Sequence, residues 1–383
     1  MKILVVGLGE AGQALISLLD GVGHDITVID KNRVCVDEMT DRFCVNGVVG
    51  SGASEETLLK AGADTADVLI ALTHTDEINL ISCMQAKAVG TRLCAARLLL
   101  PDLVKEEKAI RRKYGIDFIV KPKVDIAGEI HRNIGLPGYV KLECCVGTDL
   151  YVIDLNAVGS SPLIGRTVAG IREELTADAK ISVVVRGRKS LKPNDALEIR
   201  NGDTLYIVVS KEHLDKVLKD LQIRRGKTKN VVIVGGHTTS VYLIERLLAD
   251  HMSVTVLDDD IERCRSLMDR FPTINVAYAE GDITEVLEEE KVEKADALVS
   301  LTDDDDTNLV ISMFAWSKGI YSVITRVDKQ VHVKLLHKVN IDITVSPTEY
   351  SVFGLIRFIT AAAQEDTDAG AQIVELIRDM RRF

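Results

Sequence analysis

The same pattern of residues occurs twice in this chain of 383 residues. In each occurrence a short apolar run leads into a glycine-rich turn, and a second apolar run then ends in an aspartate. Matched landmarks lie 228 or 229 positions apart: Gly7 with Gly235, Asp30 with Asp258, Thr73 with Thr302, Asn79 with Asn308, and Arg97 with Arg326. Landmarks that recur in one order at a nearly constant spacing indicate a duplicated domain. The two occurrences are called copy one and copy two below.

Each copy alternates apolar runs with amphipathic stretches. In copy one, strands are expected near residues 2–6, 26–29, 68–72, 93–97 and 117–120. Apolar residues at helical spacing predict helices that include 12–20 and 76–89. This alternation predicts an α/β fold, with a doubly wound, Rossmann-like parallel sheet in each copy. Such a sheet binds ligands at the carboxyl ends of its strands, near the point where the strand order reverses.

The segment between the two copies has a different pattern of residues. Short strands are expected at 139–146, 150–155, 181–186 and 204–209, with helices after Gly165 and Ser210, which indicates a small α+β lobe. The predicted organisation is a first nucleotide-binding domain at 1–136, the small lobe at 137–223, a second, degenerate copy at 228–364, and a C-terminal tail at 365–383.

The turn of copy one has the spacing of a phosphate-binding loop. Gly7, Gly9 and Gly12 follow a five-residue apolar run and open a predicted helix. In this pattern the glycines allow a tight turn, a close approach of the backbone to a pyrophosphate, and tight packing of helix on strand. The amide groups and the positive dipole end at the helix start favour an anion. The alternative is a glycine-rich turn that only packs a helix onto the sheet.

An acidic residue follows this loop at the expected distance. Asp30 ends the next predicted strand, 18 residues after Gly12, where a carboxylate can accept hydrogen bonds from both hydroxyls of an adenosine ribose. A free 2′-hydroxyl at that place indicates NAD or a similar nucleotide rather than NADP.

Copy two departs from the glycine pattern. His237 stands at the second glycine position and Ser240 at the third, while Asp258 is retained. A side chain at the second position obstructs the close approach that a pyrophosphate requires. Two alternatives remain at this stage: a pocket for a mononucleotide, or a degenerate copy kept for pairing with copy one, which we favour.

A run of four aspartates, 303–306, precedes a predicted helix of copy two. Four carboxylates can collect a divalent cation, but they also suit the N-cap and first turn of a helix. We favour the helix cap, because no spaced ligand pattern accompanies the run. His332 and His337 are five positions apart, which does not align them on one helix face, so packed or solvated histidines are expected.

Composition excludes several classes of protein. The net charge of −11 argues against a nucleic-acid partner, which requires a basic surface. The sequence has no uncharged apolar run of the length that spans a bilayer. Its seven cysteines form no CxxC pair and indicate free thiols in a reducing cytosol.

Together these residues resemble the RCK (also called KTN) family, in the tandem arrangement of Trk-type potassium uptake regulators. Besides the glycine loop and Asp30, the resemblance rests on Gly50–Ser54, on Thr73–Asn79, on Ala96 with Arg97, and on the Ser161–Thr167 turn of the small lobe. A full tandem regulator would carry a second small lobe after copy two. This sequence ends before one, as a natural short form or a truncated chain would.

The resemblance implies which residues bind the nucleotide. In copy one they are Gly7, Leu8, Gly9, Glu10, Ala11 and Gly12 at the phosphates, Asp30 and Lys31 at the ribose, Gly52, Ala53 and Ser54 at the adenine, and Thr73, His74 and Arg97 around the rest. In copy two the corresponding residues include Gly235, Asp258, Thr302 and Arg326. The implied ligand is NAD(H), with ATP or ADP as alternatives.

The resemblance also implies the function. The chain would be a cytoplasmic, non-enzymatic regulator, peripheral to the inner face of the cell membrane, that docks on a TrkH-like potassium-transporter subunit. The helices expected at 124–134 and 348–363 would each cross to a partner domain, in a homodimer or tetramer. The alternative is an NAD-dependent oxidoreductase, for which a general acid or base beside the nicotinamide is required. The small lobe offers only His213 for that role.

Overall fold

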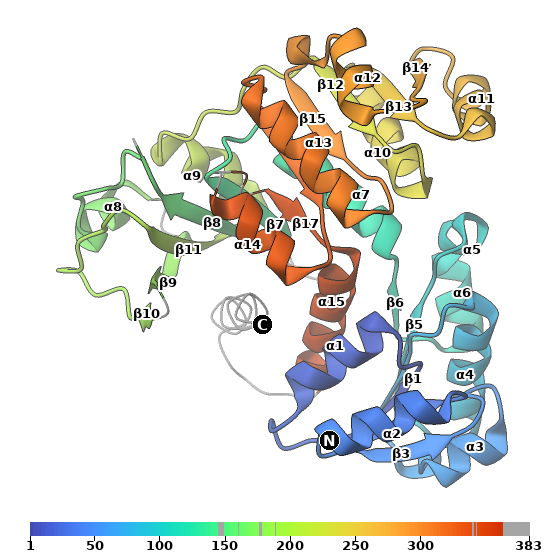
Figure 1. Cartoon of the computed structure of the whole chain (residues 1–383). Helices are drawn as coiled ribbons and strands as arrows, with labels where there is room; N and C mark the ends of the chain where they lie inside the picture. The colour runs from blue at the N-terminus through green and yellow to red at the C-terminus, as the bar shows by residue number, and fades with distance from the viewer. Residues whose placement is uncertain are drawn as a thin grey trace. The chain divides into compact units, whose positions relative to one another are not determined.

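The structure, a computed structural model, describes residues 1–144, 149–159, 161–175, 178–187, 189–338, 341 and 343–362. The predicted tail at 365–383 therefore lies outside the described residues. The described part of the chain contains two six-stranded parallel sheets and one five-stranded antiparallel sheet, with helices packed around them (Figure 1). The predicted fold class, two doubly wound sheets with a small α+β lobe between them in sequence, is confirmed.

The sheet of copy one has the strand order β3-β2-β1-β4-β5-β6. Its strands are β1 (Lys2–Val6), β2 (Asp25–Asp30), β3 (Asn46–Val49), β4 (Val68–Ala71), β5 (Leu93–Arg97) and β6 (Phe118–Val120). Residues 3–6 and 68–71 are fully buried, as expected for central parallel strands with both faces covered. The order reverses between β1 and β4, which places a ligand crevice beside the glycine turn that follows β1.

Helices cover both faces of this sheet. They are α1 (Glu10–Leu19), α2 (Arg33–Arg42), α3 (Glu55–Lys60), α4 (Asp76–Val89), α5 (Pro101–Lys105) and α6 (Glu107–Tyr114), with a 3-10 turn at Ala63–Thr65. The predicted helix at 76–89 is confirmed. The helix predicted at 12–20 begins earlier, at Glu10, because Gly9 has the extended backbone of an N-cap.

Copy two repeats this arrangement in the order β14-β13-β12-β15-β16-β17. Its strands are β12 (Asn230–Val234), β13 (Ser253–Asp258), β14 (Asn275–Tyr278), β15 (Ala297–Ser300), β16 (Ser322–Arg326) and β17 (Thr344–Val345). Its helices are α10 (Thr238–Ala249), α11 (Ile261–Arg270), α12 (Ile283–Glu289), α13 (Asp305–Ser317) and α14 (Gln330–Lys338), with a 3-10 turn at Val292–Lys294.

The small lobe is an antiparallel sheet in the order β10-β9-β11-β8-β7. Its elements are β7 (Val140–Cys144), β8 (Leu150–Ala157), α8 (Val168–Glu174), β9 (Lys180–Arg186), β10 (Lys189–Leu191), β11 (Asp203–Ser210), a 3-10 turn at Lys211–His213, and α9 (Leu214–Asp220). The predicted strands are present. The short strand β10 was not predicted, because three residues of mixed polarity carry too little periodicity.

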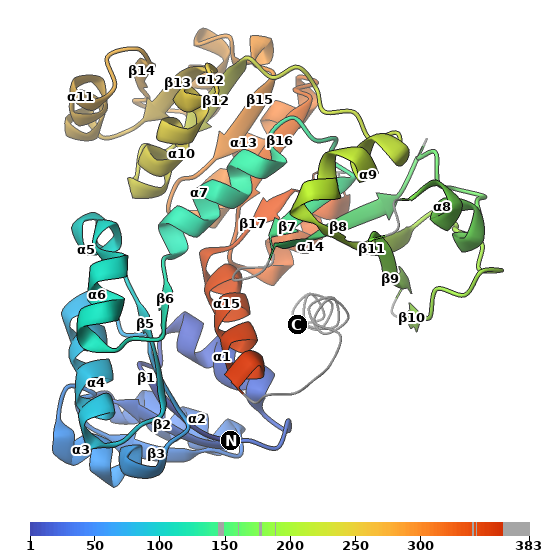
Figure 2. The same cartoon turned by 180° about the vertical axis from the view of Figure 1, so that it is seen from behind.

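The chain forms two compact units, and neither unit is a single copy. The first unit contains Met1–Lys123 together with helix α15 (Pro347–Ala362), which follows the sheet of copy two. Helix α15 packs against α1, and the two helices lie side by side in Figures 1 and 2. Its Leu355 is fully buried, and Phe358 stacks on Phe118 with ring centroids 5.3 Å apart.

The second unit contains Val124–Ser346, and thus most of helix α7 (Pro122–Asn133), which follows the sheet of copy one. Ile126 and Ile130 of α7 are fully buried. His131 lies 2.7 Å from the carboxylate of Asp250, at the end of α10.

Each unit therefore contains one parallel sheet and a helix contributed by the other copy. We call this arrangement the helix exchange. It confirms that the helix after each sheet packs on a partner copy. The compact units cut across the boundaries 1–136, 137–223 and 228–364 because the repeat follows the sheets, whereas the units follow the packing of α7 and α15.

Among the described residues, no helix has the length and apolar character needed to cross a membrane. No cluster of three or more metal-binding side chains occurs within the same residues.

Candidate functional site

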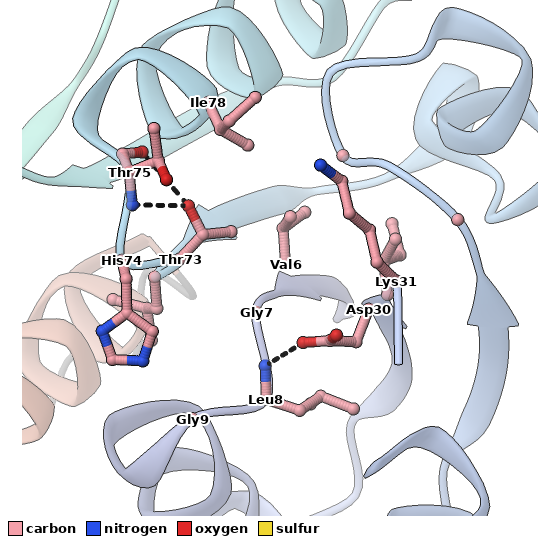
Figure 3. Close-up of a pocket in the computed structure, with 14 residues that line it drawn as sticks. Val6, Gly7, Leu8, Gly9, Asp30, Lys31, Thr73, His74, Thr75 and Ile78 are labelled. Atoms are coloured by element: carbon pink, nitrogen blue, oxygen red, sulfur yellow. Dashed lines mark hydrogen bonds between the residues drawn. The ribbon is translucent and has the colours of Figure 1, made fainter. Parts of the chain in front are cut away.

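A pocket of about 250 Å³ opens at the carboxyl ends of β1, β2 and β4, where the strand order of copy one reverses (Figure 3). Its lining consists of Val6, Gly7, Leu8, Gly9, Ile29, Asp30, Lys31, Gly50, Gly52, Leu72, Thr73, His74, Thr75 and Ile78. Eight residues singled out from the sequence meet here: Gly7, Leu8, Gly9, Asp30, Lys31, Gly52, Thr73 and His74. The other six, Glu10, Ala11, Gly12, Ala53, Ser54 and Arg97, lie outside the lining.

The three glycines of the turn have different tasks. Gly7 has a positive φ of 97°, and a Cβ there would lie 2.8 Å from the Thr73 amide nitrogen. A Cβ at Gly12 would lie 2.1 Å from the Gly7 carbonyl oxygen, so Gly12 lets helix α1 pack under the turn. A Cβ at Gly9 would point into the pocket, 3.2 Å from His74 Nε2. Of these three glycines, Gly9 is therefore the one whose missing side chain leaves space in the pocket.

The start of α1 presents backbone donors to this opening. The N-cap is Gly9, which provides no side-chain cap, and the first helical hydrogen bond runs from the Gln13 amide to the Gly9 carbonyl. The amides of the first turn precede any intrahelical acceptor, and the helix dipole adds positive potential at the same place. A diphosphate fits this arrangement, because the backbone supplies donors and Gly9 supplies the space.

Asp30 ends β2 on the other side of the pocket and is half-buried. One carboxylate oxygen accepts a hydrogen bond from the Leu8 amide at 2.8 Å (Figure 3). The other accepts from the Asn32 amide, also at 2.8 Å. These bonds fix the orientation of the carboxylate and leave lone pairs on both oxygens. The side chain thus fits the role of acceptor for ribose hydroxyls.

Behind the pocket, polar side chains hold the loop that follows β4. Asn79 accepts a hydrogen bond from the Thr73 amide at 2.8 Å and donates to the Arg97 carbonyl at 3.0 Å. Arg97 donates to the carbonyls of Leu72 and Thr73, at 2.7 and 3.0 Å. Burial lowers the pKa of Arg97, and nearby Asp76 opposes that shift. Arg97 therefore positions the loop from behind.

Two of the residues expected at the adenine, Ser54 and Ala53, make hydrogen bonds to neighbouring residues of the chain. Ser54 is the N-cap of α3, and its hydroxyl accepts from the Thr57 amide. Ala53 donates its amide to the Ser51 hydroxyl. Gly50 and Thr75 also line the pocket; the sequence analysis included them in the family motifs but did not assign them to the ligand, and it missed several apolar lining residues. Gly50 shares a turn with Gly52, which was a usable signal, whereas the apolar residues are indistinguishable from core in the sequence.

Copy two has a larger cavity, of about 610 Å³, at the equivalent place. Its lining includes the predicted Gly235, Asp258 and Thr302. Arg326 lies outside the lining and donates to the Thr302 carbonyl at 3.2 Å and to Asp303 at 2.6 Å.

Arg263 also lines this cavity, and sequence reasoning missed it. Its Nε lies 3.0 Å from a carboxylate oxygen of Asp258, whose side chain is only 2% exposed. Its guanidinium also donates to the ring of His237. Burial lowers the pKa of His237, while the neighbouring Asp303 carboxylate opposes that shift. Copy one carries a cysteine at the matching position, so the repeat itself was the available signal.

The four aspartates at 303–306 are not a shared metal site in the described structure. Asp303 pairs with Arg326, and Asp304 caps α13 by accepting from the Thr307 amide at 2.8 Å. Asp305 accepts from the backbone amides that follow β16. The N-cap interpretation is confirmed for Asp304.

His332 is a buried histidine, 3.2 Å from Asp306. The side chain of His337 lies outside the described residues.

Family models match most of the chain. The TrkA-N domain matches residues 3–122 and 231–347, and the TrkA-C domain matches 157–222. The chain belongs to the TrkA-N domain family. The two TrkA-N matches correspond to copy one and copy two, and the TrkA-C match lies in the small lobe.

Curated relatives of this TrkA-N family chain are similar over most of its length. The Trk system potassium uptake protein TrkA of Vibrio alginolyticus is 26% identical over 94% of this chain and 80% of its own length. The protein of that name from Halomonas elongata is 28% identical over 94% of this chain and 79% of its own. A TrkA homolog from Archaeoglobus fulgidus is 28% identical over 100% of this chain and 87% of its own.

Solved structures share the fold. The GsuK channel matches with a TM-score of 0.70 at 18% identity, over 94% of this chain and 64% of that one. The human SLO3 gating ring matches with a TM-score of 0.56 at 11% identity, over 100% of this chain and 86% of that one. At these identities the likeness shows the fold alone.

Proposed function

We propose that this chain is a nucleotide-sensing regulatory subunit of a potassium uptake system. Copy one binds NAD(H), with ATP or ADP as alternative effectors. The observation that carries this proposal is the pairing of an open phosphate loop at Gly9 with an accessible, oriented carboxylate at Asp30. The similarity to Trk potassium uptake proteins supports the assignment to potassium transport. A solved structure of the GsuK channel bound to NAD shares the fold, with a TM-score of 0.69 at 18% identity, over 94% of this chain and 64% of that one.

Two parts of the ligand, the diphosphate and the adenosine ribose, have partners in this pocket. The amides at the start of α1 receive the diphosphate, and Gly9 leaves the space for it. Asp30 accepts from the adenosine ribose, and Lys31 and Gly52 line the same side. His74 lies beside Gly9, at the place proposed for the diphosphate (Figure 3).

The regulated partner is a membrane potassium-transporter subunit of the TrkH-like type, on which the protein docks from the cytoplasmic side as a homodimer or tetramer. The energy for gating is the difference in nucleotide affinity between two arrangements of the protein. Light scattering of the purified chain tests the assembly. A mass that stays near one chain at every concentration, with and without nucleotide, would contradict it.

The competing function is an NAD-dependent oxidoreductase. Hydride transfer needs a general acid or base beside the nicotinamide. His213, the candidate in the small lobe, bonds Asp178 at 2.7 Å and Ser210 at 3.1 Å, and it is not among the residues that line the pocket of copy one. We therefore propose binding without turnover.

One pair of assays separates the two functions. The thermal unfolding temperature is recorded with NADH, NAD, ATP and ADP, for the wild type and for Asp30→Ala. The absorbance of NADH is then followed with a panel of small carbonyl substrates. We expect stabilisation of the wild type, a smaller effect in Asp30→Ala, and a constant NADH concentration. Sustained oxidation of NADH that Asp30→Ala abolishes would establish the enzyme instead.

A further inference from the structure

Copy two does not lack room for a nucleotide. Its cavity, of about 610 Å³, is larger than the pocket of about 250 Å³ in copy one. The two pockets differ instead in what their side chains do. In copy two, charged residues that line or border the cavity bond to one another.

Arg263 covers the carboxylate that would bind a ribose. Its Nε lies 3.0 Å from Asp258, and the same carboxylate also accepts from the amides of Gly236 and Asp260. Gly236 stands where copy one has the buried Leu8. A Cβ at Gly236 would lie 2.6 Å from Leu267 Cδ1 and 3.1 Å from an Asp258 carboxylate oxygen, so the glycine lets the turn lie close against both side chains.

The bonds continue from Arg263 across the phosphate loop. The guanidinium donates to the His237 ring, which stands at the position of Gly9. His237 Nε2 lies 3.4 Å from Asp303, and Asp303 accepts from Arg326 at 2.6 Å. We call Asp258, Arg263, His237, Asp303 and Arg326 the closing network.

The closing network ties together the same loops that a dinucleotide would bridge. It joins the end of β13, helix α11, the turn before α10, the turn after β15 and the end of β16. In copy one the corresponding residues are Asp30, Cys35, Gly9, His74 and Arg97. Three substitutions therefore remove the connections: cysteine for Arg263, glycine for His237 and histidine for Asp303.

We propose that Arg263 is the residue that excludes a dinucleotide from copy two, and that the closing network takes the place of the ligand there. Arg263 neutralises the ribose acceptor, His237 fills the seat of the diphosphate, and Asp303 repels its charge. This proposal rests on the proposed function only in taking copy one as the site that binds. His237 alone does not explain the exclusion, because its removal leaves Arg263 on Asp258.

The test restores the copy-one residues in copy two. Calorimetry with NADH compares the wild type, His237→Gly, and the triple variant Arg263→Cys, His237→Gly, Asp303→His. We expect one bound NADH per chain for the wild type and for His237→Gly, and two for the triple variant. Arg265→Cys, also on α11 but with its side chain 63% exposed, is the matched control and should bind one.

A triple variant that folds and still binds one NADH would overturn the proposal. A wild type that binds none would instead contradict the proposed function of copy one, so the two failures are distinguishable. If the triple variant does not fold, Arg263→Gln in an Asp30→Ala background gives a second test. AMP, which needs the ribose acceptor but no diphosphate seat, should then bind at least about tenfold tighter than to Asp30→Ala alone. Equal AMP affinity in the two proteins would contradict the proposal.

Discussion

Copy one and copy two have the same backbone fold but different pockets. In both, an asparagine holds the loop after the fourth strand: Asn79 bonds Thr73, and Asn308 bonds Thr302, with amide contacts of 2.8 and 2.9 Å. In both, an aspartate at the start of the next helix accepts from the loop after the fifth strand. The pockets differ where side chains face the ligand. The comparison shows that the residues that hold the loops in place are different from the residues that determine which ligand the pocket accepts.

The largest expected effect on stability comes from disrupting the helix exchange. Ile356 and Ile359 of α15 are 6% and 2% exposed. Glutamate at both positions buries charges without partners, which should destabilise that unit by about 4 kcal/mol or more. Nucleotide stabilisation should also be lost, because α15 packs on α1 and the phosphate loop opens α1. Thermal unfolding with and without NADH measures both effects.

Helix α7 provides the reciprocal variant. Ile126→Glu with Ile130→Glu should destabilise the second unit and leave NADH binding by copy one intact. Val34→Glu, at a position that is 61% exposed, serves as the harmless control. If the α15 variant melts like the wild type, the exchanged helix is not part of the first unit.

The second largest effect is expected on NADH affinity, from filling the space proposed for the diphosphate in copy one. Gly9→Val should weaken NADH by more than about a hundredfold, since the side chain fills the space between the turn and His74. Gly9 has φ −70°, which other residues adopt readily, so backbone strain is not the cause. His237→Val in copy two is the matched control and should leave NADH affinity unchanged. Calorimetric titration measures the NADH affinity of both variants. Equal affinities would contradict the proposed difference between the two loops.

The two aspartates should respond differently to the same change. Asp30→Ala removes charge-assisted hydrogen bonds to the ribose, which costs about 1.5–3 kcal/mol of binding, or roughly ten- to a hundredfold in affinity. Asp258→Ala should leave NADH affinity unchanged and lower the stability of the second unit by about 1–3 kcal/mol, because Arg263 loses its buried partner. Titration and urea unfolding of both variants give the comparison. A loss of NADH affinity in Asp258→Ala would show that copy two binds.

The smallest effect is a pH dependence confined to copy two. Burial lowers the pKa of His237, with Arg263 adding to the shift and the Asp303 and Asp258 carboxylates opposing it. The unfolded imidazole therefore takes up a proton before the folded one. The neutral His237 contributes its full stabilisation of the folded protein above about pH 6.5, the pKa of a histidine in the unfolded chain. This stabilisation is lost as the pH falls below that value.

Unfolding by urea at about pH 7.5 and about pH 5.5 measures this dependence. His237→Gln, which does not titrate, should lose less stability on acidification than the wild type does. Equal losses in the two proteins would contradict the assignment.

The sequence predicted much of the fold because a repeat doubles every signal. Strand β4 and helix α4 could be placed from the buried run and the helical spacing, and Gly7, Asp30 and Thr73 from the glycine and acid pattern. Ala53, predicted beside the adenine, is not part of the pocket lining, because the family pattern does not distinguish neighbours within one turn.

The closing network could not be read in the same way. Arg263 lies on a helix where a surface arginine is ordinary, and only its contact with Asp258 gives it a role. The helix exchange was expected from the apolar face of residues 348–363, but the identity of its partner, α1, depends on packing between distant segments.

The most direct test of the difference between the copies is the number of NADH molecules bound per chain and its dependence on Asp30. Calorimetric titration of the wild type should give one site per chain. Asp30→Ala should weaken that site roughly ten- to a hundredfold, while Asp258→Ala should match the wild type. Two equivalent NADH sites in the wild type, or one site that weakens with Asp258→Ala and not with Asp30→Ala, would contradict the account.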